Sequence, residues 1–215
     1  MFYRNLNELN IRLLFILVSL LYLSLAFLTN TFLFTKQFYF EVFANKFTGE
    51  RITEMIEYSN KLIWVGYFCI PLFLILKLLI IALILCTGLE FGGYRIKYSL
   101  VLKIVILAES MMILMAFSKF TYLIYFKSTD IEILKNYYPF SLISLFQIKS
   151  IPYYFVYPLQ LLNLFEVGYW IILVFLIKKT ICVTFLNSFK VIASSYGISM
   201  FVWILFVMFI QLQFS

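Results

Sequence analysis

The stretch that decides the fold is LIWVGYFCIPLFLILKLLIIALILC, residues 62–86. It is apolar along nearly its whole length, and its one charged residue is Lys77. A helix needs about 20 such residues to cross the hydrocarbon core of a bilayer, so this stretch predicts a transmembrane helix. Pro71 lies inside it, and we expect a bend there because proline removes a backbone hydrogen bond.

Other apolar runs on both sides of this stretch predict a polytopic, all-α transmembrane helix bundle with about five spans. The expected spans are residues 11–34, 62–86, 99–117, 159–177 and 191–212, and the third span has an alternative end at residue 126. The chain of 215 residues is 64% hydrophobic and 13% charged, which is too apolar for one soluble core. We therefore expect a single transmembrane domain over residues 1–215, with the lipid bilayer as its main partner.

Two longer loops, residues 35–61 and 127–158, separate these spans, and we expect both to be structured. The second loop contains an apolar piece, residues 140–146, that is too short to span and predicts an interfacial or re-entrant segment. The first loop predicts an amphipathic helix that leads directly into residue 62, because one helical face gathers Ile52, Met55, Ile56 and Ser59.

The distribution of basic residues predicts the orientation in the membrane. With five spans, the amino end and the two short turns share one side, and they hold most of the flanking charge: Arg4, Arg12, Arg95, Lys97, Lys178, Lys179 and Lys190, against Glu8 and Glu90. The positive-inside rule then predicts a cytoplasmic amino end, and an extracytoplasmic carboxyl end and long loops. The net charge of +7 is explained by these flanking positions, so no nucleic-acid partner is expected.

The residue types that are missing exclude several classes of chemistry. The chain has no histidine, which is the usual general base and the commonest zinc ligand. Its three cysteines, Cys69, Cys86 and Cys182, are far apart and show no CxxC spacing, so neither a metal cluster nor a disulfide framework is predicted. We expect no catalytic residues, no metal and no cofactor.

Three ionisable residues lie inside the expected spans, namely Lys77, Glu109 and Glu166. Charges in a membrane are costly and mark candidate sites. Lys77 and Glu109 are each 16 residues from Gly93, which lies in the turn between their helices. They are therefore at the same depth, and we predict an ion pair or a shared polar cavity. The pair either fixes only the arrangement of the helices, or forms a proton or ion relay with Glu166 as third member.

Small residues at the start of the last span form a second candidate site. They are spaced so that one helix face carries Ala193 and Gly197, and another Ser195 and Ser199. Such small-xxx-small pairs let helices approach closely in lipid. The pattern predicts either internal helix contacts or a docking face for another membrane subunit.

Two motifs suggest a family. The sequence LLNLF, residues 161–165, enters a span, and a short basic turn leads to SSYG, residues 194–197. With five spans and the orientation above, residues 62–212 resemble the Yip family of membrane proteins, which in eukaryotes are partners of Rab GTPases in vesicle traffic. Because the long cytoplasmic amino-terminal region of the eukaryotic members is lacking, the resemblance implies the bacterial branch and the bacterial plasma (inner) membrane. It implies no catalytic residues.

These observations predict a non-catalytic integral membrane subunit, a scaffold or accessory component of a transport or envelope-assembly complex, which binds another membrane protein. The first alternative is a small transporter or channel component that uses Lys77, Glu109 and Glu166. The second is a membrane enzyme acting on lipid-linked substrates; it is less favoured, because the chain has no histidine and no paired carboxylate motif.

Overall fold

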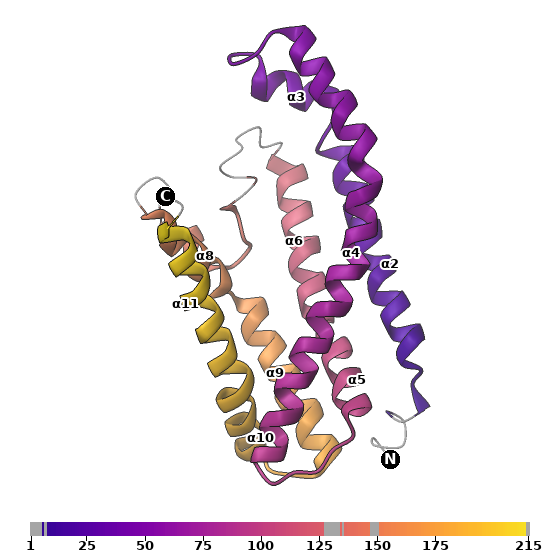
Figure 1. Ribbon diagram of the computed structural model, residues 1–215, viewed down its shortest axis with the longest axis vertical. Coiled ribbons are helices and arrows are strands. Elements are labelled where there is room, and N and C mark those ends of the chain that lie inside the picture. The colour runs from indigo at the N-terminus through magenta and orange to yellow at the C-terminus, as the bar shows by residue number, and fades with distance from the viewer. Residues whose placement is uncertain (1–5, 7, 127–133, 135, 147–150, 214–215) are drawn as a thin grey trace.

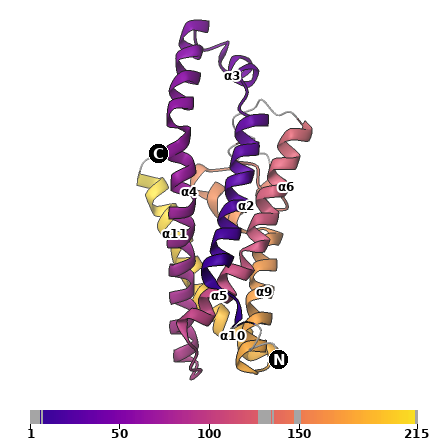
Figure 2. The same cartoon turned by 90° about the vertical axis from the view of Figure 1, so that its right-hand side faces the viewer.

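The computed structural model describes residues 6, 8–126, 134, 136–146 and 151–213. Within these residues the protein is helical, and its only β-type pairing is one isolated bridge. The helices stand side by side in an elongated bundle (Figures 1 and 2). The elements are α2 (Ile11–Phe32), α3 (Lys36–Phe43), α4 (Gly49–Phe91), α5 (Tyr98–Ala108), α6 (Ser110–Phe126), η1 (Leu142–Leu145), α8 (Tyr153–Leu161), α9 (Leu164–Ile181), α10 (Phe185–Ile192), η3 (Ala193–Gly197) and α11 (Ile198–Gln213).

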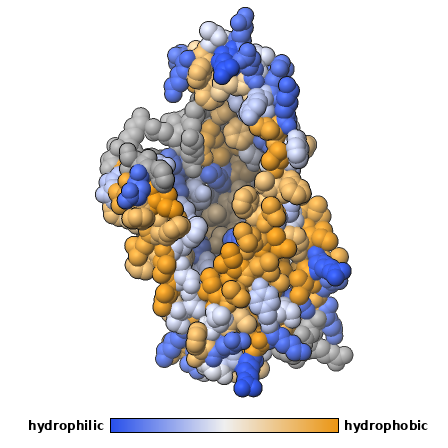
Figure 3. Space-filling model, in the orientation of Figure 1, coloured by the Kyte–Doolittle hydropathy of each residue, from blue (hydrophilic) through white to orange (hydrophobic). Residues whose placement is uncertain are grey.

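Four helical stretches of the described residues are long and apolar enough to cross a membrane: Ile11–Phe32, Gly49–Phe91, Tyr98–Phe126 and Phe185–Gln213. Figure 3 shows mainly hydrophobic surface over the middle of the molecule and hydrophilic surface at its two ends. The prediction of an all-α, multi-pass membrane protein is confirmed. The fourth of the five predicted spans is not among these stretches, because α9 has 18 residues and carries Glu166, Lys178 and Lys179.

The amphipathic helix of the first long loop and the second span form one continuous helix, α4, of 43 residues. This confirms that the loop helix leads directly into the span. The first turns of α4 project beyond the bundle together with α3 (Figures 1 and 2). Helix α3 begins where the Thr35 side chain accepts a hydrogen bond from the backbone N–H of Phe38.

Helix α6 continues to Phe126, so the alternative end of the third span at residue 126 is confirmed and the end at residue 117 is too early. Past residue 117 the helix carries Lys119, whose ammonium lies 4.5 Å from the centre of the Tyr138 ring. A cation on an aromatic face is stabilised, so the helix accommodates this charge. The span is interrupted earlier, at Glu109, where α5 ends and α6 begins.

The predicted uninterrupted helix over residues 159–177 is wrong. Helix α8 ends at Leu161 and α9 starts at Leu164, because the side chain of Asn163 accepts a hydrogen bond from the Glu166 N–H and caps α9. The second long loop pairs with this break: Leu142 donates its N–H to the Leu162 carbonyl, and the Phe140 carbonyl accepts from Leu164. A helix break leaves backbone N–H and C=O groups without partners in the helix, and these two bonds satisfy one group of each kind.

The two ends of the bundle differ in what they contain (Figure 1). Helix α2 starts at one end, where the α4–α5 and α9–α10 turns also lie. These turns are closed by Gly93 and Cys182, which have φ values of 82° and 56°. Helices α3 and α8 and the end of α11 lie towards the opposite end. The last helix begins at Phe185 rather than residue 191, so its start was predicted too late.

Candidate functional site

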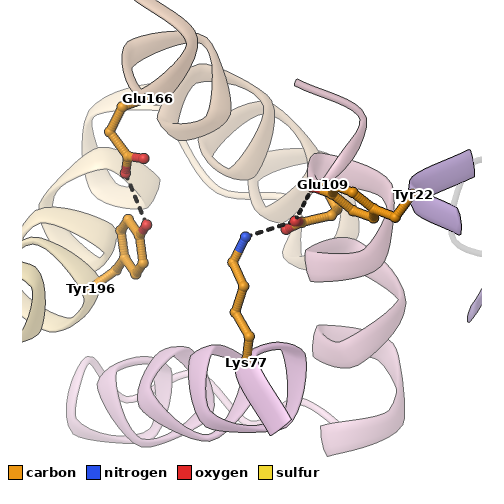
Figure 4. Close-up of polar contacts among 5 residues, drawn as sticks. All are labelled: Tyr22, Lys77, Glu109, Glu166 and Tyr196. Atoms are coloured by element: carbon orange, nitrogen blue, oxygen red, sulfur yellow. Dashed lines mark hydrogen bonds and ion pairs between the residues drawn. The ribbon is translucent and has the colours of Figure 1, made fainter. Parts of the chain in front are cut away.

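The predicted ion pair between α4 and the third span is confirmed. Nζ of Lys77 lies 2.6 Å from Oε1 of Glu109, which stands at the junction of α5 and α6. The hydroxyl of Tyr22, on α2, donates to the same carboxylate oxygen at 2.7 Å. Three separate helices therefore meet at one carboxylate, as Figure 4 shows.

Lys77 and Glu166 lie far along their helices from the turns that follow α4 and α9. Lys77 precedes Phe91, the last residue of α4, by 14 residues, and Glu166 precedes Ile181, the last residue of α9, by 15. With a rise of about 1.5 Å per residue, both lie about 21–23 Å from those helix ends. Both side chains are therefore far from the α4–α5 and α9–α10 turns.

The two partners of the ion pair differ in exposure. Glu109 is fully buried, whereas 43% of the Lys77 side chain is exposed. Helix α4 contacts α10 and η3 near one end of the bundle. Helix α11 follows η3 in the chain and contacts α8. Figure 1 shows α4 and α11 standing apart beyond η3, and Figure 3 shows a hollow with hydrophilic surface in that face. Lys77 therefore belongs to a bundle that is open on one side.

Glu166 forms a second polar group, with residues of α9 and η3. Its Oε1 accepts one hydrogen bond from the Tyr196 hydroxyl at 2.8 Å and another from Nε1 of Trp170 at 3.0 Å. The side chain is buried and belongs to the first turn of α9. In Figure 4 the Lys77 ammonium lies between Glu109 on one side and the Glu166–Tyr196 pair on the other. The structure thus pairs Lys77 with Glu109 and brings Glu166 to the opposite side of the same ammonium.

Tyr169 lies between these two groups on α9. It is fully buried, and its hydroxyl interacts electrostatically with the carboxylates of Glu109 and Glu166. Its ring centre is 5.6 Å from that of Tyr196. Among the described residues, neither the Tyr169 hydroxyl nor Oε2 of Glu109 has a hydrogen-bond partner. Two buried polar atoms of the same cluster thus have no protein partner among the described residues, whereas most buried polar atoms have one.

A largely apolar pocket of about 600 Å³ adjoins the Glu166 side of the cluster. Glu166 is the one charged residue among those that line it. The remaining lining comes from the α8–α9 break, from α9 itself, from α10 and from α11: Phe140, Leu142, Leu161, Leu162, Asn163, Leu164, Val167, Trp170, Ile171, Val174, Phe185, Phe189 and Met200.

The small residues of the last span serve internal contacts at two of their four positions. Gly88 of α4 lies against Ser195, and Gly197 lies against the Trp170 ring, so that a methyl group on either glycine would collide. Ala193 and Ser199 are half-buried, and their role as a docking face stays a prediction. The segment adopts a π-helical turn, which is frequent at functional sites.

The groups gathered here are carboxylates, phenols and an amine, which exchange protons and attract ions. In the part of the chain that the structure describes, no three His, Cys, Asp or Glu side chains come together to hold a metal. Proton exchange and cation binding are the chemistry that these side-chain types offer.

Sequence reasoning missed Tyr22, Tyr169, Trp170 and Tyr196 as members of the cluster. Tyrosine is enriched at membrane interfaces, so a tyrosine in the middle of a span, such as Tyr22, was an available signal. The helix break also had a signal, because Asn163 followed three residues later by Glu166 is typical of a helix start.

Comparisons of the chain with models of protein families, with curated proteins and with solved structures find no match. The resemblance to the Yip family therefore stays a prediction that rests on the motifs quoted above.

Proposed function

We propose that this protein is a non-catalytic, multi-pass membrane subunit that moves protons or small ions through its intramembrane charge cluster, formed by Lys77, Glu109 and Glu166. It acts either as a small transporter or as a component of one. The observation that carries this proposal is the Lys77–Glu109 ion pair, formed deep in the bundle with the Lys77 side chain 43% exposed. Ionisable residues within membrane-spanning helices mark ion and proton pathways in many membrane proteins.

Two further features support a relay. Oε2 of Glu109 and the Tyr169 hydroxyl are buried without partners among the described residues, so they are free to accept or pass a proton. The α8–α9 break lies three residues before Glu166, and broken helices at membrane depth line substrate or ion sites in many transporters.

The proposal includes the topology. Helices α8 and α9 together form the fifth crossing, interrupted at residues 162–163, and they lie alongside the other helices in Figure 1. The basic turns next to Arg95, Lys97, Lys178 and Lys179 face the cytoplasm, and both long loops face outwards. The same proposal assigns the chain to the bacterial branch of the Yip family and to the bacterial plasma membrane.

Proton flux in liposomes tests this function. The purified full chain is reconstituted, a potassium diffusion potential is applied, and proton uptake is followed with a pH-sensitive dye. We expect uptake above that of protein-free vesicles, and we expect Glu109→Gln to abolish it. Glu90→Gln is the matched control, because Glu90 is an exposed carboxylate near the end of the same helix as Lys77. Uptake in Glu109→Gln equal to that of the wild type would contradict the relay.

A scaffold role is the second candidate, and the exposure of the last helix favours it. Helix α11 has no buried residue, and its exposed apolar side chains include Phe201, Trp203 and Phe206. Large exposed apolar faces suit either lipid or another membrane subunit. Affinity purification at native expression level, followed by mass spectrometry, distinguishes the two roles. Stoichiometric recovery of one membrane protein, with no flux from the isolated chain, would favour the scaffold.

A further inference from the structure

The apolar pocket beside Glu166 has the form of a ligand site rather than of a packing defect. Its volume of about 600 Å³ lies within the range of small-molecule pockets. Its lining comes from α9, from the α8–α9 break, from α10 and from Met200 of α11. Because nearly all of the lining is apolar, water is a poor occupant, and the pocket suits a hydrophobic body.

The charge of the pocket selects among hydrophobic ligands. Among the described residues of the lining, Glu166 is the one with a charge, and both hydrogen bonds that its carboxylate accepts fall on Oε1. The groups that act on it are the donors Tyr196 and Trp170, together with Lys77 and Glu109. Lys77 is engaged by Glu109 at 2.6 Å, so among the residues that the structure describes Glu166 has no cation of its own. A carboxyl group in such surroundings is neutral only when it carries a proton or pairs with a cation.

Aromatic rings provide a second feature that attracts cations. Trp170 and Phe189 line the pocket with their ring centres 6.5 Å apart, and Phe140 and Phe185 also contribute. Aromatic faces attract organic cations, most strongly where water is excluded. An apolar pocket with one carboxylate and several rings is complementary to a bulky cation whose charge is covered by hydrocarbon.

We propose that this pocket binds a lipophilic organic cation, whose charged centre takes the place of the proton on Glu166. The exchange is balanced: one cation enters, one proton leaves the carboxyl group, and the net charge of the pocket is unchanged. The proposal rests on the proposed function, because it names the class of cation that Glu166, a member of the charge cluster, would exchange for protons.

Binding of tetraphenylphosphonium to the purified full chain in detergent tests the pocket without any ion gradient. Tetraphenylborate is the matched control, because it has nearly the same shape and the opposite charge. In isothermal titration we expect the phosphonium to bind and the borate not to bind. Affinity for the phosphonium should rise as the pH is raised, since fewer protons then compete for Glu166, and proton release should accompany binding.

Two variants locate the site. Glu166→Gln keeps an oxygen that accepts from Tyr196 and removes the charge, and we expect it to weaken binding about tenfold or more. Ile171→Trp should also weaken binding, because Ile171 lines the pocket and a larger ring fills it. Phe175→Trp is its matched control, since Phe175 is also exposed on α9 but lies outside the lining.

Equal binding of the phosphonium and the borate would overturn the proposal, and so would unchanged affinity in Glu166→Gln. The outcome is separable from that of the flux experiment. Binding that depends on Glu166, in a protein without proton flux, would leave the pocket standing and remove the proposed function. Proton flux that depends on Glu109, in a protein that does not bind the phosphonium, would do the reverse.

Discussion

The two halves of the third span differ sharply, although they are consecutive in the sequence. In α5 almost every residue from Leu100 to Ala108 is buried against neighbouring helices. In α6, after Glu109, the buried residues are only Met112 and Leu123. The bundle is thus closed around α5, towards the α4–α5 turn, and opens along α6, towards α3 (Figures 1 and 2).

The charged residues lie where the closely packed half of the third span, α5, meets the less closely packed half, α6. Glu109 stands at the boundary itself, and Lys77 reaches it from α4. Towards the α4–α5 turn, Gly88 and Ser195 are in close contact. Towards α3, a methyl group added at Gly66 would touch nothing within 4 Å. The charge cluster therefore lies at the boundary between a closely packed half of the bundle and a half that is less closely packed. The following predictions test each side of this boundary.

The largest effect is expected from breaking the ion pair. Lys77→Met leaves the fully buried Glu109 without a cation, and should lower the free energy of unfolding by about 3 kcal/mol. The measurement is unfolding in mixed detergent micelles, followed by circular dichroism.

Removing the whole polar group is the matched control for this change. In the triple variant Tyr22→Phe, Lys77→Met and Glu109→Met, no charge or donor of the pair remains, so most of the lost stability should return. A triple variant no more stable than Lys77→Met alone would show that the ion pair itself holds the helices together.

The next effect contrasts two glycines of α4. Gly88→Ala forces a methyl group against Ser195 in the closed half, and should lower the free energy of unfolding by about 1–3 kcal/mol. Gly66→Ala, in the open half, meets nothing and should raise it by about 0.5 kcal/mol through helix propensity. Thermal unfolding of both variants in one detergent is the check. Similar losses in the two variants would remove the distinction between the halves.

The smallest effect is expected at the boundary, from Tyr169→Phe. This change removes a buried hydroxyl without a partner among the described residues, so stability should be unchanged or higher by about 1 kcal/mol. Tyr98→Phe is the control, because its hydroxyl donates to the Leu79 carbonyl and its loss should cost about 0.5–1 kcal/mol. A clear loss of stability in Tyr169→Phe would mean that its hydroxyl has a partner that holds the fold.

The features of the fold and site that the sequence predicted correctly depend on distances along helices and on hydropathy. The rise of a helix is fixed, so equal spacing of Lys77 and Glu109 from Gly93 was sufficient to predict their pairing. The continuity of the loop helix with the second span followed from unbroken helical periodicity. Helical class and membrane insertion followed from hydropathy alone.

The parts that sequence reasoning missed depend on rotation about helix axes and on distant segments. Tyr22 and Tyr196 reach the carboxylates from helices that are far apart in the sequence, and no periodicity fixes which way they face. The break before α9 has backbone partners at residues 140–142, which hydropathy averaged over one span does not detect. The same averaging hid the early start of the last helix at Phe185.

Proton uptake by liposomes that contain the triple variant Tyr22→Phe, Lys77→Met and Glu109→Met tests the central claim most directly. In this variant stability is expected to return while every charge of the ion pair is gone, so fold and function are separated. We expect most of the wild-type stability, with proton uptake no greater than that of protein-free vesicles. Uptake equal to that of the wild-type protein would show that protons do not pass through the charge cluster, and would contradict the account.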